Sequence, residues 1–117
     1  MAYCHIHNTY HNGTRAKMTC ILSITRGIPL DNAVEKVNRR VDDPAFHRLR
    51  TKVNKMWEEW DYFKEGAESI LKFNSLFGRE SPSFDDRLLL TKSVIKKSDF
   101  SAVGRMVVSE IQVVAGR

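Results

Sequence analysis

The stretch that decides the fold, residues 44–73, reads PAFHRLRTKVNKMWEEWDYFKEGAESILKF. Its apolar residues recur at spacings of three and four positions, and they are Phe46, Leu49, Val53, Met56, Trp60, Phe63, Ala67 and Ile70. This heptad spacing places them on one face of an α-helix. Asp43 can cap that helix and Pro44 suits its first turn. We therefore predict one long amphipathic helix over residues 44–73.

The length and charge of this helix raise the question of what covers its apolar face. Thirty residues of helix span about 45 Å, whereas a compact chain of this size is only about 35 Å across. Basic residues lie in its first half and acidic residues in its second, so two copies packed antiparallel would pair opposite charges. We predict a homodimer through Phe46, Leu49, Val53, Met56, Trp57, Trp60 and Phe63. The alternative is that this face packs on the chain's own sheet and the charges are solvated.

The segment before the helix carries a strong turn signal at Asn12-Gly13. A type I′ turn needs positive φ at both central residues, and this dipeptide is typical of β-hairpins. We predict antiparallel strands at Tyr3–His11 and Thr14–Thr25. Pairing back from the turn puts His5, His7, His11 and Cys20 on one face and Cys4 on the other.

The remaining segments complete the predicted architecture. Asp31 is a plausible N-cap for a short helix with Val34, Val37 and Val41 inward. Residues 84–97 allow a helix with Ser83 and Asp86 as a capping box, but we favour a hairpin strand at 87–95. The β-branched density of Arg105–Val114 favours a strand. The predicted fold is α+β in a single domain, 1–117: a β-hairpin, a short and a long helix, and C-terminal strands that complete a small antiparallel sheet.

The composition limits the classes of protein to consider. The chain has 117 residues, 42% hydrophobic and 28% charged, which allows a core and argues against wholesale disorder. No apolar run approaches the roughly 18 residues that span a bilayer, so we expect no membrane partner. Two cysteines are too few for a disulfide scaffold and suit a reducing compartment. We expect a cytoplasmic protein.

The net charge of +5 is unevenly distributed. Residues 1–30 contribute +3, residues 31–57 another +3, and residues 58–72 contribute −3. The two helices that meet near Asp42-Asp43 bring bases around one corner, where they could neutralise several phosphates of DNA or RNA. The predicted nucleic-acid-binding residues are Arg15, Lys17, Arg39, Arg40, Arg48, Arg50, Lys52 and Lys55.

The first 20 residues hold Cys4, His5, His7, His11 and Cys20, enough nitrogen and sulfur ligands for zinc. On the predicted hairpin His5, His7 and Cys20 are neighbours on one face, so they are the metal candidates. Their spacing matches no common zinc template. The alternative, which we favour from the sequence, is a polar strand face with a buried Cys20, no metal and no cofactor.

His5-Ile6-His7 reads as histidine-hydrophobic-histidine on a strand, and it resembles the metal-binding motif of HUH endonucleases. The resemblance implies a divalent metal held by the two histidines and a tyrosine nucleophile on a later helix. Tyr62, in Tyr62-Phe63-Lys64, would be that tyrosine. Its spacing to the lysine is one residue shorter than in that family.

Together these patterns predict a small basic nucleic-acid-binding accessory or regulatory protein that is not an enzyme. One alternative is a protein-interaction module or inhibitor that binds another protein through its aromatic helix. A metal-dependent HUH-like endonuclease is a further alternative.

Overall fold

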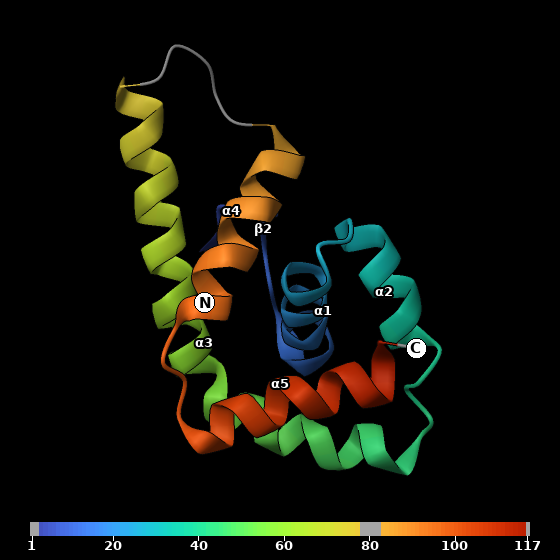
Figure 1. Cartoon of the computed structure of the whole chain (residues 1–117). Coiled ribbons are helices and arrows are strands. Elements are labelled where there is room, and N and C mark those ends of the chain that lie inside the picture. The colour runs from blue at the N-terminus through green and yellow to red at the C-terminus, as the bar shows by residue number, and fades with distance from the viewer. Residues whose placement is uncertain (1–2, 78–82, 117) are drawn as a thin grey trace.

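The computed structural model describes residues 3–77 and 83–116, and these form five helices and one short hairpin. The elements are β1 (Tyr3–Cys4), β2 (Thr9–Tyr10), α1 (Gly13–Arg26), α2 (Leu30–Asn38), α3 (Pro44–Phe77), α4 (Phe84–Lys97) and α5 (Ala102–Ala115). Helix α1 lies at the centre and packs against the other four helices (Figure 1). The α+β prediction is therefore wrong, because the described C-terminal half contains helices and no strand.

Helix α1 replaces the predicted second strand of the hairpin. Every residue from Met18 to Ile24 is buried. A continuous apolar run fits a buried strand and a buried helix equally well, and the run is buried here because helices surround it. The hydroxyl of Thr19 donates to the carbonyl of Arg15 at 2.8 Å, so this buried polar group is satisfied within the helix.

Asn12-Gly13, which we took as a hairpin turn, instead starts α1. Asn12 takes the extended conformation of an N-cap, and Gly13 has a φ of 84°. The actual turn lies earlier, between Cys4 and Thr9, with Tyr3 paired to Tyr10 and Cys4 to Thr9. It contains Asn8 at a φ of 54°, and asparagine tolerates this left-handed region better than most residues.

The end of α1 follows from Gly27. This glycine has a φ of 67°, its amide donates to the carbonyl of Ile24, and the amide of Ile28 donates to that of Ser23. These two bonds form a Schellman motif, which ends a helix at a left-handed residue. Helix α2 then begins at Leu30, with Pro29 rather than Asp31 at its N-cap.

Helix α3 confirms the predicted long helix and extends it to Phe77. The carboxylate of Asp43 accepts a hydrogen bond from the amide of Ala45 at 2.9 Å, which is the predicted cap. A straight helix of 34 residues would be about 51 Å long, more than the 47 Å of the whole chain's longest dimension. Figure 1 shows how it fits: its first part passes below α5 and its second part turns upward beside α4.

Helix α4 takes one of the two conformations that the sequence allowed. Ser83 caps it by accepting a hydrogen bond from the amide of Asp86 at 3.1 Å, as the capping box predicts. The prediction of a strand at 87–95 is therefore wrong. The buried residues of α4 are Leu88, Thr91 and Ile95.

Helix α5 overturns the strand predicted at Arg105–Val114. Its buried positions are Gly104, Val107, Ile111 and Ala115, which recur with helical spacing. Packing on this stripe outweighs the preference of valine and isoleucine for strands, since β propensity depends on context. None of the described helices is long and apolar enough to cross a membrane.

The long helix holds the start of α5 through a carboxylate. Glu59 accepts hydrogen bonds from the backbone amide and, at 2.7 Å, the hydroxyl of Ser101, the N-cap of α5. Gly104 permits this approach, because a Cβ there would lie 2.9 Å from a carboxylate oxygen of Glu59. Gly66 of α3, in contrast, has open space around it.

These two helical glycines make a matched test. Gly66→Ala should raise the free energy of unfolding by about 1 kcal/mol, because alanine favours helix. Gly104 lies in the first turn of α5, so Gly104→Ala gains less propensity, and its Cβ displaces the Glu59 carboxylate from Ser101, which costs about 1 kcal/mol. We expect urea unfolding to place the Gly104 variant about 1 kcal/mol or more below the Gly66 variant. Equal stabilisation by the two substitutions would contradict the Glu59–Ser101 contact.

Candidate metal centre

The N-terminal turn presents three potential metal ligands within eight residues. Cys4 ends β1, His7 lies in the turn, and His11 directly follows β2. The turn is anchored by the fully buried side chain of Ile6, whose carbonyl accepts a hydrogen bond from Arg87 of α4 at 3.3 Å. These contacts hold the three ligands over the middle of α1.

Helix α1 supplies the fourth ligand, Cys20. One ligand atom from each of Cys4, His7, His11 and Cys20 lies within 4.8 Å of the others. The distance from Cys4 Sγ to His7 Nδ1 is 3.4 Å, and that from His7 Nδ1 to His11 Nε2 is 3.2 Å. Zinc bonds of about 2.3 Å to sulfur and 2.0–2.1 Å to nitrogen, at tetrahedral angles, place ligand atoms about 3.3–3.8 Å apart, the sulfur–sulfur pair being the widest. The four residues therefore have the ligand types of a tetrahedral zinc site, and the two distances above are close to its spacing.

A second shell orients His7. Its Nε2 lies 2.8 Å from the hydroxyl oxygen of Ser23, and that hydroxyl lies 2.7 Å from the carbonyl of Ile28. A carbonyl only accepts, so Ser23 donates to Ile28 and accepts from His7. The ring proton is thus assigned to Nε2, which leaves the Nδ1 lone pair directed at the other three ligands. Metal-binding histidines are commonly fixed in this way.

The two cysteines have opposite pKa shifts. The pKa of Cys4 is far below its usual value because Cys20 and His11 hydrogen-bond its thiolate and the charge of Lys64 favours it. The pKa of Cys20 is raised well above its usual value by burial and by the neighbouring thiolate of Cys4. The metal-free pair thus holds one thiolate and one thiol. Because zinc binds thiolates, its binding would release the proton of Cys20.

A buried lysine from α3 adds positive charge beside the cysteines. The side chain of Lys64 is 1% exposed, and its Nζ lies 3.4 Å from Asp61 and 5.2 Å from the centre of the Trp57 ring. Burial lowers its pKa, but the negative charge of the coupled Cys20–Cys4 pair and that of Asp61 outweigh this effect, so the pKa of Lys64 is raised. Lys64 therefore remains an ammonium group that attracts the thiolates.

Two buried side-chain nitrogens without hydrogen-bond partners among the described residues act on Cys20. Lys64 Nζ and Trp60 Nε1 are the buried side-chain atoms without a hydrogen-bond partner in the described part of the chain. Both nevertheless lower the pKa of Cys20, Lys64 through its charge and Trp60 through its N–H. A thiolate bound to a metal is a natural acceptor for such donors.

The structure places the predicted metal candidates as follows. His7 and Cys20 belong to the cluster, whereas His5 points outward, its side chain 69% exposed and 4.0 Å from Glu68. Cys4 was left out of the candidate set because the predicted register put it on the opposite face, and His11 because that register placed it next to the turn, away from Cys20. Close spacing was the available signal: C-x2-H-x3-H supplies three ligands from one turn. Cys4 and Cys20 are both free, although they face each other rather than pointing apart as predicted.

The HUH-like arrangement does not form at His5-Ile6-His7. These residues lie in a turn rather than a strand, and only His7 faces the cluster. Tyr62 is 71% exposed and packs edge-on against Phe63, its neighbour on α3. The two histidines that the resemblance requires on one face therefore diverge.

The predicted nucleic-acid-binding bases separate into two groups. Arg15 and Lys17 of α1 donate to Asn38 of α2 and Asn54 of α3 at 3.4 Å and 3.3 Å. Arg50 precedes Asn54 by one helical turn and so lies on the same side of α3, and Arg39 adjoins Asn38 in the sequence. We call Arg15, Lys17, Arg39 and Arg50 the α1–α3 basic face.

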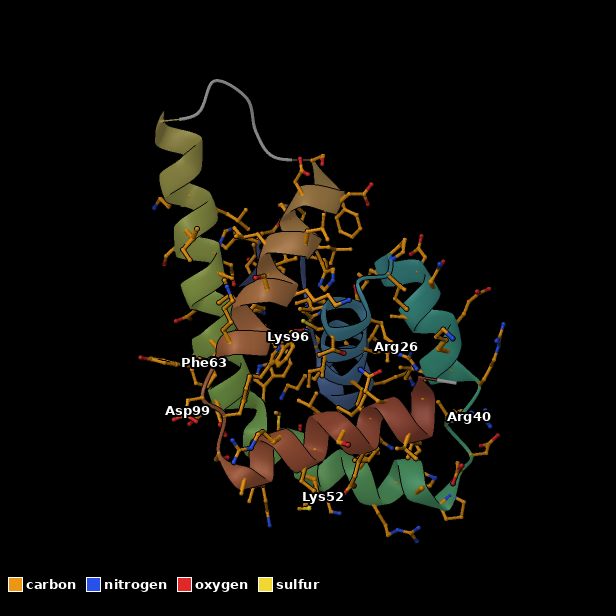
Figure 2. All side chains as sticks on the ribbon, in the orientation of Figure 1. Arg26, Arg40, Lys52, Phe63, Lys96 and Asp99 are labelled. Carbon is orange, nitrogen blue, oxygen red and sulfur yellow. The ribbon has the colours of Figure 1, made fainter. Side chains whose placement is uncertain are left out.

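The second group lies on another side of α3. Lys52 forms an ion pair with Glu110 of α5 at 3.1 Å, and Arg48 and Lys55 share its flank of the helix. Figure 2 shows Lys52 where α5 crosses α3 and Arg40 at the corner between α2 and α3. The eight predicted bases therefore do not form one continuous site.

The apolar face of α3 packs within this chain. Phe46, Leu49, Val53, Met56 and Trp60 are at most 2% exposed, and Trp57 and Phe63 are partly buried against the same core. Trp60 stacks on Phe100 with ring centres 6.0 Å apart. The residues predicted as a dimer interface thus belong to the core of one chain. The homodimer itself stays a prediction.

No family model, curated protein or solved structure matches this chain.

Lys64 can be tested with a matched lysine on the same helix. Lys64→Met should raise the pKa of the Cys20 thiol further in metal-free protein, because it removes a positive charge that favours the Cys20 thiolate. Zinc must displace the proton of Cys20, so zinc affinity at pH 7 should fall by about tenfold. Lys72→Met, exposed on the same helix, is the control. Alkylation rates against pH and zinc competition titrations measure both effects, and equal behaviour of the two variants would exclude the role of Lys64.

Proposed function

We propose that this chain is a zinc-binding module in which the metal has a structural, non-catalytic role. The observation that carries the proposal is the convergence of Cys4, His7, His11 and Cys20 within 4.8 Å, at spacings that suit a tetrahedral ion. Four protein ligands fill the coordination shell, and a closed shell is typical of structural zinc, whereas catalytic zinc keeps an open position. Two free cysteines that serve as ligands suit a reducing compartment such as the cytoplasm.

The metal would add to the contacts of Ile6 that join the N-terminal segment to the core. Strands β1 and β2 are two residues each, and an isolated hairpin of this size is marginal in water. Three ligands come from this hairpin and its flank, and the fourth comes from the central helix. Zinc would therefore hold the N-terminal segment onto the core.

The zinc proposal predicts one zinc ion per chain in protein purified without a histidine tag. Free zinc at about 1,000 times the dissociation constant should raise the free energy of unfolding by about 4 kcal/mol, because the unfolded chain lacks the assembled site. A strong chelator should remove that gain. Elemental analysis and chelator-dependent thermal unfolding measure the two quantities.

The histidines provide the control for this experiment. His11→Ala should lose the bound zinc and the chelator-sensitive stability, whereas His5→Ala should keep both, because His5 points away from the cluster. Retention of a full zinc equivalent by the His11 variant would sink the proposed ligand set. So would a wild-type protein that binds less than one equivalent with zinc in excess.

We further propose that this module binds DNA or RNA through the α1–α3 basic face. Arg15 and Lys17 are hydrogen-bonded to asparagine side chains rather than to carboxylates, so their charge is not neutralised. The ion pairs of the described chain involve His5, Lys52 and Lys64, none of which belongs to this face. Uncompensated bases around two amide side chains suit contacts to phosphate oxygens.

Salt dependence tests this second proposal. A 20-nucleotide single strand and a 20-base-pair duplex, each fluorescently labelled, should bind at about 50 mM salt and dissociate as salt rises. Removing three bases, Arg15→Ala, Arg39→Ala and Arg50→Ala, should lower the slope of log affinity against log salt by about 2–3, close to one per phosphate contact. Fluorescence anisotropy measures this slope.

The matched control removes the same charge elsewhere, through Lys72→Ala, Lys92→Ala and Lys97→Ala, and should leave the slope nearly unchanged. Failure of both polynucleotides to bind at low salt would end the nucleic-acid proposal while leaving the zinc proposal intact. It would favour the alternative of a protein-interaction module. Equal loss in the two triple variants would indicate binding by overall charge.

A further inference from the structure

A pocket opens on another side of the molecule, where α1, α4 and α5 meet. It has a volume of 390 Å³, within the range of small-molecule sites. Its wall is formed by the end of α1, the C-terminal half of α4, the connection to α5, and α5 itself. The lining residues are Thr25, Lys92, Ile95, Lys96, Ser98, Phe100, Arg105 and Val108.

The floor of the pocket is apolar and fixed by the core. Ile95 and Phe100 are 7% and 6% exposed, so most of each side chain is already packed. Phe100 stacks on Trp60 and lies 4.5 Å from Phe63, ring centre to ring centre. The pocket therefore rests on side chains that are already held in place.

The uncharged polar groups of the wall are already engaged. The hydroxyl of Thr25 donates to the carbonyl of Ile21 at 2.7 Å and accepts from the side-chain amide of Gln112. The hydroxyl of Ser98 donates to the carbonyl of Val94 at 2.7 Å. A ligand would therefore find its donors among the three cations, Lys92, Lys96 and Arg105.

These cations have no carboxylate partner among the described residues. The acids nearest along the chain and across α5 are directed elsewhere: Glu110 pairs with Lys52, and Glu59 binds Ser101. Figure 2 shows Asp99 at the outer edge of the molecule, away from Lys96, which lies on the side of α4 toward α1. The pocket thus combines an apolar floor with positive charge that the chain leaves uncompensated.

We propose that this pocket binds an amphiphilic organic anion, a carboxylate or phosphate monoester with an apolar body. The apolar body would rest on Ile95, Phe100 and Val108, where burying its surface contributes about 25 cal/mol per Å². The anionic head would lie among Lys92, Lys96 and Arg105, whose side chains reach it with charge-assisted hydrogen bonds. A neutral ligand would forgo these bonds, and a small inorganic anion would leave the apolar floor uncovered.

Calorimetry with decanoate and decyl phosphate as probes tests this pairing of chemistries, with decanol, acetate and inorganic phosphate as the comparison set. We expect at least one of the two decyl anions to bind, decanol to bind at least about fivefold more weakly, and the small anions not to bind. Equal binding of decanol and decanoate, or no binding of either decyl anion, would overturn the proposal.

Substitutions of Lys96, Arg105 and Lys97 test whether the anion binds in this pocket. Lys96→Ala and Arg105→Ala should each weaken the bound decyl anion by about fivefold. Lys97→Ala, an equal loss of charge one position along α4 but outside the pocket, should change affinity by less than about twofold. If Lys96→Ala and Lys97→Ala had the same effect, the anion would be attracted by net charge and the pocket assignment would be wrong.

Trp60 supplies a readout from inside the molecule. Because Trp60 stacks on Phe100, a ligand on Phe100 should alter its fluorescence, observed in a Trp57→Phe background where Trp60 is the single tryptophan. Val108→Phe should fill the pocket and remove this response while the zinc content stays at its wild-type level. A response that persists in the Val108 variant would place the ligand elsewhere.

Discussion

The complete burial of the middle of α1 is the constraint on which the rest of the structure depends. Seven consecutive residues, from Met18 to Ile24, are buried, so every side of this helix needs a covering element. Helices α2, α3, α4 and α5 provide that cover, and α3 bends to share its length between α4 and α5 (Figure 1). A helix surrounded in this way is an unusually rigid place for a side chain. Cys20 and Ser23, a proposed metal ligand and the group that orients His7, both lie on it.

The N-terminal segment packs against this buried helix, and its own hydrogen bonds are not enough to stabilise it there. Its strands are too short to be stable alone, and within residues 3–12 Ile6 is the one fully buried aliphatic side chain. Four ligand atoms converge where this segment meets α1, beside a buried ammonium group. Without a metal, such a cluster concentrates polar and charged groups at the core, which is costly. A bound cation would neutralise that charge, and its ligand bonds would join the segment to the helix.

The sequence predicted the parts of this fold that have a distinctive periodicity, and it failed where periodicity is ambiguous. Spacings of three and four over Phe46 to Ile70 occur only on a helix, so α3 was predicted with its cap. The run from Met18 to Ile24 has no period, and Asn12-Gly13 then favoured the wrong element. At Val107 and Ile111 the helical spacing was present, but the preference of β-branched residues for strands was given more weight.

The error at Asn12-Gly13 also determined how much of the metal site could be predicted. A strand register fixes which side chains share a face, so the wrong register brought His5 in and put Cys4 out. His7 and Cys20 were retained because the predicted strand register and the actual fold both bring them together. The ligands come from a turn and a helix, and ligand geometry across such a junction depends on tertiary packing. Local spacing could indicate a ligand cluster there, but it could not identify which residues belong to it.

The acidic residues within 58–72 make contacts inside the chain, and these contacts change how their charge is interpreted. From the sequence, its charge of −3 suggested pairing with the basic half of a second copy. In the structure Glu59 accepts hydrogen bonds from Ser101, the N-cap of α5, Asp61 lies near Lys64, and Glu68 accepts a hydrogen bond from the backbone of His5 at 3.2 Å. The side chain of Glu68 is 11% exposed, so this carboxyl faces the interior of the chain, and its burial raises its pKa. Three of the five acids therefore serve contacts within the chain, and the charge asymmetry of α3 needs no second copy to balance it.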